Sequence, residues 1–589
     1  MSSQEKSLLD RVRETAFKHA LVNAVKHEGK ADFKAVVSKV IGEIPEIRSR
    51  IKEFIDLIKG TIEEVNKLSI EDQLKIIREN WPELLEEKRE AKEKELPPLP
   101  NAEKGKVVTR FAPNPDYTIH LGNARPALLS YWYAELYNGA MILRFEDTDP
   151  RIKSPYPEAY TMIKDALKWL GVKWSKEYIQ SLRMNIFYNV ARELISRGGA
   201  YIDTCPDKEF RLYRNAGKAC PHRNTSVEEN LEKFDKMLEG HYGEGDAVLR
   251  VKTDLQHPDP SVRDWVAFRV IDTSKTPHPV TGEKYIVWPT YNFAAGVDDY
   301  LMGVTHVLRA KEHISNTVKQ KYLYKHMGWK YPETIHFGRL SLEGVILSKS
   351  KMRKLVKEQG ISPYDDPRLG TINGLRRRGI LRETIWKIVK EVGIKPIDAK
   401  ISLVNLYAIN RILVDPVANR YMGVEEPVPV ILKDVKEELK AQIPIHPSRP
   451  GHYEYRILDG SVIHISSKDL GTLLQSEHKT FRAMGLANFT ITEPTILDGK
   501  PAFIARLHSI SQEDARKLNA PIIQWVSNDE KTDLFLLIPS GSEIREARLL
   551  VEKRIINEKP DSIVQLYRVG FIRIDTIKEE KVIAVFSHE

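Results

Sequence analysis

The stretch VVTRFAPNPDYTIHLGNARPALLSYWYAELYNGAMILRF, residues 107–145, decides the fold of the middle of this chain. The β-branched run at 107–111 predicts a strand, and the turn residues at 113–116 end it. A helical pattern follows from 121 to 137, and the apolar run at 140–145 predicts a second strand. A strand, a helix and a strand in succession predict a βαβ unit of a parallel sheet, and therefore an α/β domain.

The pattern changes on both sides of this unit. In residues 1–95, apolar side chains recur at steps of three and four, which predicts helices. A charge run with three prolines at 86–100 predicts a linker, because proline cannot continue a helix. Residues 360–420 have a basic helical pattern. After Pro427, short apolar runs separated by turns predict an all-β region, a barrel or a sandwich.

Length, charge and cysteine content limit the class of protein. A chain of 589 residues exceeds what one hydrophobic core usually serves, so we expect roughly three to five domains. The net charge of +9 is compatible with a polyanionic partner such as nucleic acid. Two cysteines, no signal-peptide pattern and no bilayer-length apolar run predict a cytoplasmic protein without membrane contact. We expect it to act as a monomer.

Two segments suit a nucleotide. His120 and Gly122 occur where the first predicted strand gives way to a helix, whose unpaired N–H groups attract phosphate. Gly122 would let a ligand approach the backbone, and His120 could donate to a phosphoryl oxygen. The second segment is ILSKSKM at 346–352, whose lysines and serines could hold a triphosphate. Each segment alone is also compatible with an ordinary helix start or a solvated loop.

Together and in this order, the two segments resemble the HIGH and KMSKS motifs of class I aminoacyl-tRNA synthetases. The first stands here as residues 120–123, His-Leu-Gly-Asn, and the second as residues 346–350, Ile-Leu-Ser-Lys-Ser. Further segments resemble the glutamate/glutamine branch of that class: LRFEDTDP at 143–150, WPTYNF at 288–293, GVTH at 303–306, DPR at 366–368, TINGLRRRG at 371–379, QWV at 524–526 and RVGF at 568–571. The resemblance covers about residues 105–589. The β pattern near the C-terminus and the N-terminal helices are typical of the archaeal type of glutamyl enzyme.

The resemblance implies a multidomain α/β architecture. We expect a Rossmann-type catalytic domain with an inserted acceptor-binding domain, a helical linker region, a C-terminal all-β barrel region that binds the anticodon, and an N-terminal helical extension. The boundaries that it suggests are 1–95 for the helical extension, 105–200 and 286–360 for the two catalytic halves, 201–285 for the insertion, 361–420 for the helical stem-contact region and 421–589 for the β-barrel region.

The resemblance also implies a reaction. ATP, with Mg²⁺, would activate L-glutamate as glutamyl-adenylate, and the 3′ end of tRNA(Glu) would then accept the glutamyl group. Bound tRNA would be needed before activation. The implied catalytic residues are His120, Asn123, Ser348 and Lys349. The ATP site would comprise Pro113, Asn114, Pro115, His120, Leu121, Gly122, Asn123, Ser348 and Lys349. Because the second motif begins with Ile346 and Leu347 in place of Lys-Met, we assign the phosphate role there to Lys349.

A few side chains favour glutamate over glutamine. By resemblance, Glu146 would receive the α-ammonium group and Tyr291 would lie beside it. A γ-carboxylate suits guanidinium groups, and the resemblance brings Arg110 and Arg309 to the side-chain end. Glutaminyl enzymes carry a small neutral residue where Arg309 stands. An internal salt bridge of Arg309 with Asp298 or Asp299 remains an alternative.

Two further features stay open. Asp203-x-Cys205 and Cys220-x-His222 resemble a zinc knuckle of related enzymes, with an aspartate as the first ligand. The alternative is two reduced cysteines and a surface histidine. The arginine run at 376–378 is compatible with phosphate contacts or with a solvated helix face.

Three rival functions remain at this point. A glutaminyl-tRNA synthetase shares the fold and differs at Arg309. A truncated paralogue that glutamylates a modified base would lack residues 400–589. A catalytically inactive RNA-binding protein would have damaged motifs, whereas all seven central motif residues are present here: Arg110, His120, Gly122, Glu146, Tyr291, Ser348 and Lys349. The sequence does not decide whether tRNA(Gln) is also charged, which residues contact the anticodon, or what the N-terminal helices do.

Overall fold

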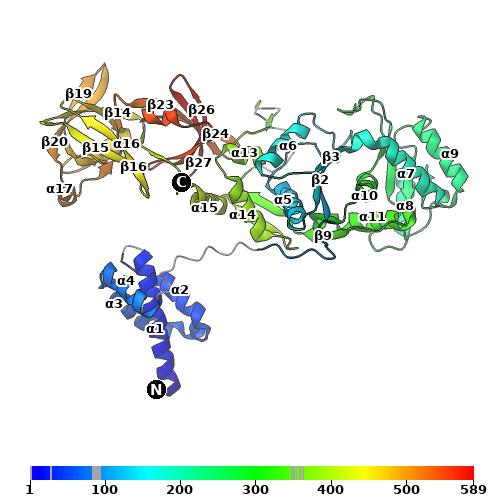
Figure 1. Cartoon of the computed structure of the whole chain (residues 1–589), viewed down its shortest axis with the longest axis horizontal. Helices are drawn as coiled ribbons and strands as arrows, with labels where there is room; N and C mark the ends of the chain where they lie inside the picture. Colours follow the sequence, from blue (N-terminus) through cyan, green and yellow to red (C-terminus); the bar gives the residue numbers. More distant parts are fainter. Residues whose placement is uncertain are drawn as a thin grey trace. The chain divides into compact units, whose positions relative to one another are not determined.

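The computed structural model describes residues 3–26, 29–81, 95–345 and 364–589, with single positions between 352 and 362. The chain divides into two compact units, Met1–Glu95 and Leu96–Glu589. The first unit is helical, as predicted, and appears in blue in Figure 1. Its elements are α1 (Ser3–Lys26), α2 (Phe33–Glu43), η1 (Pro45–Arg50), α3 (Ile51–Asn66) and α4 (Ile70–Asn80). Their apolar faces pack into a core of their own around Val12, Val40, Ile58 and Ile77.

The centre of the second unit is the predicted parallel βαβ unit. It comprises β1 (Val108–Phe111), α5 (Leu121–Leu136) and β2 (Ala140–Phe145), and β3 (Lys176–Ile179) pairs in parallel with β2. A second parallel pair is β8 (His306–Ala310) with β9 (Glu333–Phe337). The amide of Thr305 donates to Val108 O at 2.9 Å, which brings β8 beside β1. The order β3-β2-β1-β8-β9 reverses its direction between β1 and β8, so the sheet has a topological switch point there.

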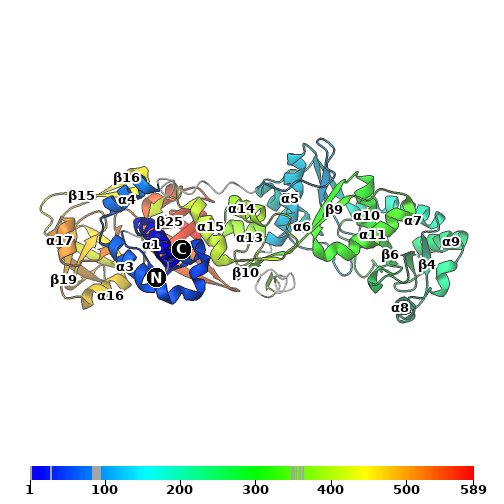
Figure 2. The same cartoon turned by 90° about the horizontal axis from the view of Figure 1, so that it is seen from below.

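A four-stranded antiparallel sheet is inserted between β3 and β8. It contains β4 (Ala200–Asp203), β5 (Val248–Val251), β6 (Val266–Val270) and β7 (Val287–Pro289). The helix α6 (Ala159–Trp169) connects β2 with β3 and packs in the core of the parallel sheet. The helices of the inserted region are η3 (Gln180–Arg183), α7 (Met184–Ser196), α8 (Asp207–Ala216), η4 (Pro221–Asn224), α9 (Val227–Leu238) and η5 (Pro260–Val262). The chain returns to the parallel sheet through α10 (Tyr291–Leu301), η6 (Lys311–His313) and α11 (Ile314–Met327), and α10 and α11 lie side by side in Figure 2.

A mainly helical segment follows β9. It contains β10 (Leu340–Glu343), α13 (Ile372–Arg377), α14 (Arg382–Val392), β11 (Ala399–Ser402) and α15 (Leu403–Val414). Ile372 N donates to Ile119 O at 3.0 Å, which ties the start of α13 to the segment before α5.

The arginine run of α13 joins this segment to the C-terminal sheets. Arg377 pairs with Asp575 at 2.7 Å, and Arg376 pairs with Asp561 at 3.0 Å. Arg378 is buried and donates to the hydroxyl of Tyr407 at 2.7 Å. For Arg377 and Arg378, a freely solvated helix face does not describe the structure, because Arg377 is ion-paired and only partly exposed and Arg378 is buried.

The C-terminal region consists mainly of β-strands, in agreement with the prediction, and forms two barrel-like seven-stranded sheets with a few short helices. Their orders are β12-β25-β26-β27-β23-β24-β13 and β21-β18-β19-β20-β14-β17-β22, with a separate hairpin β15-β16. The strands are β12 (Arg420–Tyr421), β13 (Gly423–Glu425), β14 (Pro427–Lys433), β15 (Leu439–His446), β16 (Arg449–Ile457), β17 (Val462–Ser466), β18 (Thr480–Ala483), β19 (Asn488–Leu497), β20 (Lys500–Ser509), β21 (Ile522–Ile523), β22 (Val526–Ser527), β23 (Lys531–Ser540), β24 (Glu543–Glu552), β25 (Ile563–Leu566), β26 (Gly570–Lys578) and β27 (Lys581–His588). The helical elements among them are α16 (Ser467–Gln475), α17 (Gln512–Lys517) and η7 (Lys553–Asn557). Among the described helices of the whole chain, none has both the length and the apolar character that crossing a bilayer requires.

Candidate active site

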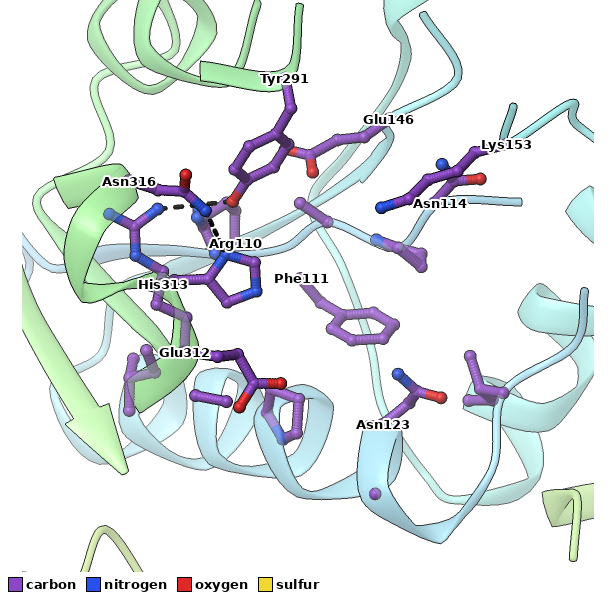
Figure 3. A pocket seen from close by; sticks show the side chains of 18 of the residues that line it. Arg110, Phe111, Asn114, Asn123, Glu146, Lys153, Tyr291, Glu312, His313 and Asn316 are labelled. Carbon is purple, nitrogen blue, oxygen red and sulfur yellow. Dashed lines mark hydrogen bonds between the residues drawn. The ribbon is translucent and has the colours of Figure 1, made fainter. Parts of the chain in front are cut away.

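A cavity of about 800 Å³ opens at the switch point of the parallel sheet. Its walls come from the ends of β1, β2 and β8 and from the starts of α5, α10 and α11. Ligands of open α/β sheets bind in this position, because the strand order reverses there and leaves a crevice between the loops. Figure 3 shows Tyr291, His313 and Asn316 close together beside Arg110, whereas Asn123 lies at the start of α5.

The start of α5 is held by a reciprocal cap. Nδ1 of His120 accepts from Gly122 N at 3.0 Å, and Oδ1 of Asn123 accepts from His120 N at 3.2 Å. Because Nδ1 accepts, the neutral ring carries its proton on Nε2. Asn123 therefore helps to cap α5, and His120 lies at a helix N-terminus that lines the cavity.

Gly122 is required by close packing. A Cβ at this position would lie 2.8 Å from Cε1 of His120 and 2.9 Å from Leu340 O. The glycine thus lets the start of α5 pack against β10, which is a different reason from the ligand approach expected from the sequence.

The structure brings most of the expected nucleotide-site residues to the cavity, but not all of them. Pro113, Asn114, His120, Gly122 and Asn123 line the cavity. Leu121 is buried in the hydrophobic core of the parallel sheet, and Pro115 is also buried, so neither lines the cavity. Oδ1 of Asn114 and Oγ1 of Thr118 are buried without a hydrogen-bond partner among the described residues, so a ligand could satisfy them. Ser348 and Lys349 lie outside the described residues.

A buried charge network connects β1, β2 and α10. Oδ1 of Asp299 accepts from Arg144 Nη1 at 2.8 Å and from Arg110 Nε at 3.2 Å. Arg144 Nη2 donates to Oε1 of Glu146 at 2.9 Å. Burial raises the pKa of Asp299, but the opposing effect of Arg110 and Arg144 is larger. The pKa of Asp299 therefore lies below its ordinary value. Burial raises the pKa of Glu146 above its ordinary value, although Arg144 and Arg110 oppose the shift. A cationic ligand group would therefore stabilise the Glu146 carboxylate.

Arg309 is buried in a different environment. Its Nη2 contacts three uncharged oxygens, those of Thr317 at 2.6 Å, Gln320 at 3.0 Å and Tyr331 at 3.1 Å. Its Nη1 donates to the hydroxyl of Tyr291 at 3.4 Å. In the described part of the chain, no carboxylate lies within ion-pair distance of this guanidinium group, and its Nε has no partner there.

The alternative of an internal salt bridge for Arg309 is therefore wrong. Asp298 pairs with Arg183 at 2.9 Å, and Asp299 is shared by Arg110 and Arg144. Burial lowers the pKa of the Arg309 guanidinium group, and Asp299, which acts on it only at longer range, raises that pKa. A buried cation without a direct ion pair is costly, so an anionic group next to Arg309 would be favourable.

Two residues at the start of α11, His313 and Asn316, were not among the site residues that the sequence predicted. His313 packs against Tyr291 with its ring centroid 5.6 Å away, and Asn316 Nδ2 lies 3.0 Å from His313 Nδ1. Burial, and then the charge of Arg309, lowers the pKa of His313 to about 4, so the ring is neutral. The only signal in the sequence was position, because His313 follows the C-terminal end of a parallel strand closely, where functional side chains of α/β proteins gather.

The four predicted metal ligands converge in the inserted region. Candidate ligand atoms of Asp203, Cys205, Cys220 and His222 all lie within 4.8 Å of one another. His222 Nδ1 is 3.0 Å from Asp203 Oδ1 and 3.3 Å from Cys205 Sγ, and Cys220 Sγ is 3.7 Å from Asp203 Oδ1. The second oxygen of Asp203 accepts from Arg250 Nε at 2.6 Å, which orients the carboxylate. Two thiols, an imidazole and a carboxylate at this spacing form a candidate site for a cation that prefers tetrahedral N, O and S ligands.

Comparison with known proteins identifies the family. The family model for tRNA synthetases class I (E and Q), catalytic domain, matches residues 106–413, and two anticodon-binding domain models of the same class match residues 418–505 and 522–575. A glutamate–tRNA ligase of Staphylothermus marinus is 60% identical over 97% of this chain and 100% of that protein. The glutamate–tRNA ligase of Hyperthermus butylicus is 51% identical over 97% of this chain and 100% of that protein. The glutamate–tRNA ligase of Pyrococcus furiosus is 49% identical over 98% of this chain and 100% of that protein.

Among solved structures, a glutamate tRNA ligase from Elizabethkingia meningosepticum is similar at a TM-score of 0.39 and 24% identity, over 53% of this chain and 70% of that chain. The catalytic model alone spans more than half of the present sequence, and the relatives match it from end to end. The chain therefore belongs to the class I tRNA synthetase family of the glutamate and glutamine enzymes.

Proposed function

We propose that the chain ligates L-glutamate to the 3′ end of tRNA(Glu) at the expense of ATP. The relatives that match it over nearly their whole length are named for this activity. The observation that carries the choice of glutamate is the buried guanidinium group of Arg309, which has only uncharged partners among the described residues. An anionic side chain would supply the missing counter-charge, whereas the neutral amide of glutamine would not.

The amino acid would be held at both ends. In this proposal, the Glu146 carboxylate receives the α-ammonium group, and the hydroxyl of Tyr291 borders it. Arg309 and Arg110 receive the γ-carboxylate. Glutamine would leave buried donors poorly paired, and such a mismatch supports strong discrimination.

The nucleotide would lie along the start of α5. We assign Pro113, Asn114, His120, Gly122 and Asn123 to the ATP site, because they line the cavity at a helix N-terminus. The N–H of His120 would donate to a phosphoryl oxygen, and Ser348 and Lys349 would complete the phosphate site. Mg²⁺ would bridge phosphate oxygens, as it does in other ATP sites.

Two displacements would follow in the same cavity. An oxygen of the α-carboxylate of glutamate attacks the α-phosphorus of ATP, which forms glutamyl-adenylate and releases pyrophosphate. A ribose hydroxyl of the terminal adenosine then attacks the acyl carbon, which forms the ester and releases AMP. The protein's part is to position the reactants and to stabilise the developing charge. As in related enzymes, bound tRNA would be required before the first step.

We also propose roles for the remaining parts. Residues 201–285 would bind the acceptor end, 361–420 would contact the tRNA stem and 421–589 would bind the anticodon. The Asp203, Cys205, Cys220 and His222 cluster would hold a structural Zn²⁺. We expect the chain to act as a monomer in the cytoplasm.

The test is aminoacylation with purified tRNA(Glu) and tRNA(Gln), each offered labelled glutamate or glutamine. Glutamate on tRNA(Glu) is the expected result. Glutamate on both tRNAs would make the enzyme non-discriminating and would imply a later amidation of the glutamyl group on tRNA(Gln). Glutamine loaded in preference to glutamate would overturn the assignment of Arg110 and Arg309 and leave the class of reaction unchanged.

A further inference from the structure

The first neighbours of Arg309 are arranged by α11 and the segment before β9. Gln320, which is 1% exposed, accepts through Oε1 from Arg309 Nη2 at 3.0 Å and from the Tyr331 hydroxyl at 2.8 Å. Thr317, one turn earlier on α11, accepts from the same Nη2 and also lies 2.9 Å from His336 Nε2. Three side chains thus hold one guanidinium nitrogen in place.

These neighbours share the property that they carry no charge. Burial, followed by a weaker opposing effect of Arg309, leaves the pKa of Tyr331 raised, so its phenol stays protonated. Burial and Arg309 lower the pKa of His336, so its ring stays neutral. The carboxylates in and beside the cavity pair with other arginines. Asp299 is shared by Arg110 and Arg144, Glu146 pairs with Arg144, Asp149 with Arg269, and Glu312 with Arg339. The positive charge of Arg309 is therefore held in place without a direct ion pair among the described residues, and only the longer-range effect of Asp299 on its pKa partly balances it.

Gln320 is the position where a carboxylate that balances the charge of Arg309 would be easiest to introduce. Glutamate has the shape of glutamine, and its carboxylate oxygen at this place would lie about 3 Å from the guanidinium nitrogen, where charge-assisted bonds form. Such a pair would compete directly with a substrate carboxylate for Arg309. A neutral amide here accepts the same hydrogen bonds without that competition.

We propose that Gln320 is a specificity-determining positioning residue, which holds Arg309 through an uncharged acceptor so that its charge remains available to an anionic amino-acid side chain. The inference rests on the proposed function and deepens it, because it assigns the preference for glutamate over glutamine to a residue that does not touch the substrate. Gln320 acts through Arg309 and has no part in the chemical step.

The test compares Gln320→Glu with Gln320→Met in tRNA-dependent ATP–pyrophosphate exchange by the full-length chain. Glutamine serves as a competitive inhibitor, so that its affinity is measured even if it is not activated. For Gln320→Glu we expect the KM for glutamate to rise at least about 100-fold with little change in kcat, and the inhibition constant for glutamine to change less than about threefold. For Gln320→Met, which removes the acceptor without adding charge, we expect a rise in KM of about tenfold or less and a preserved preference for glutamate.

Thr317→Asp is a second, independent variant, because it adds a carboxylate beside the same nitrogen from another turn of α11. Thr317→Asp should weaken the preference for glutamate over glutamine, as Gln320→Glu should. Circular dichroism and thermal unfolding establish that each variant is folded. If the glutamate preference survives in folded Gln320→Glu or Thr317→Asp, the inference is wrong.

The Gln320→Met arm decides the matter even if both acidic variants fail to fold. Loss of the glutamate preference in Gln320→Met would show that the hydrogen bond, and not the absence of charge, sets specificity, and it would overturn the inference. The wild-type chain distinguishes failure of the proposed function from failure of the role proposed for Gln320. If it does not activate glutamate, the proposed function fails, whereas normal wild-type activity with an unchanged preference in the acidic variants removes only the role of Gln320.

Discussion

At the scale of single residues, two kinds of buried arginine lie in and beside the cavity. Arg110 and Arg144 share the carboxylate of Asp299, so much of their charge is balanced inside the protein. Arg309 is held by hydroxyl and amide oxygens alone among the described residues. Similar side chains therefore serve different purposes, because a balanced arginine stabilises the site and an unbalanced one attracts an anion.

His313 gives a pH prediction at this scale. Its pKa is lowered to about 4, mainly by burial, so the ring should stay neutral as the pH falls and take up its proton only near pH 4. The unfolded chain would bind this proton near pH 6.5, so the folded state should lose stability between about pH 6.5 and pH 4 through this residue. Histidine-selective ¹³C NMR measures the titration, and His313→Asn assigns the resonance. A midpoint above pH 6 would contradict the burial argument.

At the scale of elements, the start of α5 combines capping with close packing. His120 and Asn123 close the cap, and Gly122 permits contact with β10. The start of α13 is tied to the segment before α5 by the hydrogen bond from Ile372 N to Ile119 O. The geometry of the nucleotide site thus depends on elements far apart in the sequence.

Gly122→Ala should disturb this arrangement. The new Cβ would lie 2.9 Å from the backbone oxygen of Leu340, so α5 or β10 must shift. Overpacking of this kind costs about 1–3 kcal/mol, so we expect a lower melting temperature and a KM for ATP raised about tenfold. Gly471→Ala is the matched control, because Gly471 lies within α16 and a Cβ there meets nothing within 4 Å. Equal behaviour of the two variants would argue against the packing role.

The candidate metal cluster connects the end of β4 with the start of η4. Purified protein should contain about one zinc per chain, because two thiolates, an imidazole and a carboxylate complete a tetrahedral site. Cys220→Ser should lose the metal and lower the melting temperature, whereas His241→Ala, which changes an exposed histidine of the same region, should do neither. Elemental analysis and thermal unfolding measure both effects. Protein purified without chelators that contains no zinc would leave the cluster as a hydrogen-bonded group only.

At the scale of the whole molecule, the chain consists of two units with separate cores. Residues that line the cavity all belong to the unit Leu96–Glu589, and the helices before it pack around their own apolar side chains. Within the second unit, the ion pairs of Arg376 and Arg377 connect α13 to the C-terminal sheets. The same helix is tied to the segment before α5, so α13 connects the candidate active site with the β region.

A chain of residues 96–589 should therefore fold and remain active. Because no cavity residue is removed, we expect tRNA-dependent ATP–pyrophosphate exchange to stay within about threefold of the full-length value, as for a unit with its own core. The assay uses equal concentrations of the two proteins with thermal unfolding as the control for folding. A soluble, folded 96–589 chain without exchange activity would show that the N-terminal helices contribute to catalysis.

Local patterns were sufficient for much of the fold and for the motif residues. The βαβ unit, the N-terminal helices and the C-terminal strands follow from hydrophobic periodicity and turn residues, which depend on neighbours a few positions apart. The resemblance to the synthetase motifs indicated Arg110, Glu146, Tyr291 and Arg309, and all four line one cavity. The metal ligands also converge, because their two short motifs flank the single helix α8.

Only the tertiary structure decided what surrounds these residues. The sequence left Arg309 with a candidate salt bridge to Asp298 or Asp299, whereas the fold directs both carboxylates to other arginines. It suggested that Gly122 makes room for a ligand, and the fold adds a second reason for the glycine, the close packing of α5 against β10. Periodicity reports which face of an element is buried, but the partner of a buried charge depends on which distant elements meet, and no local pattern encodes that meeting.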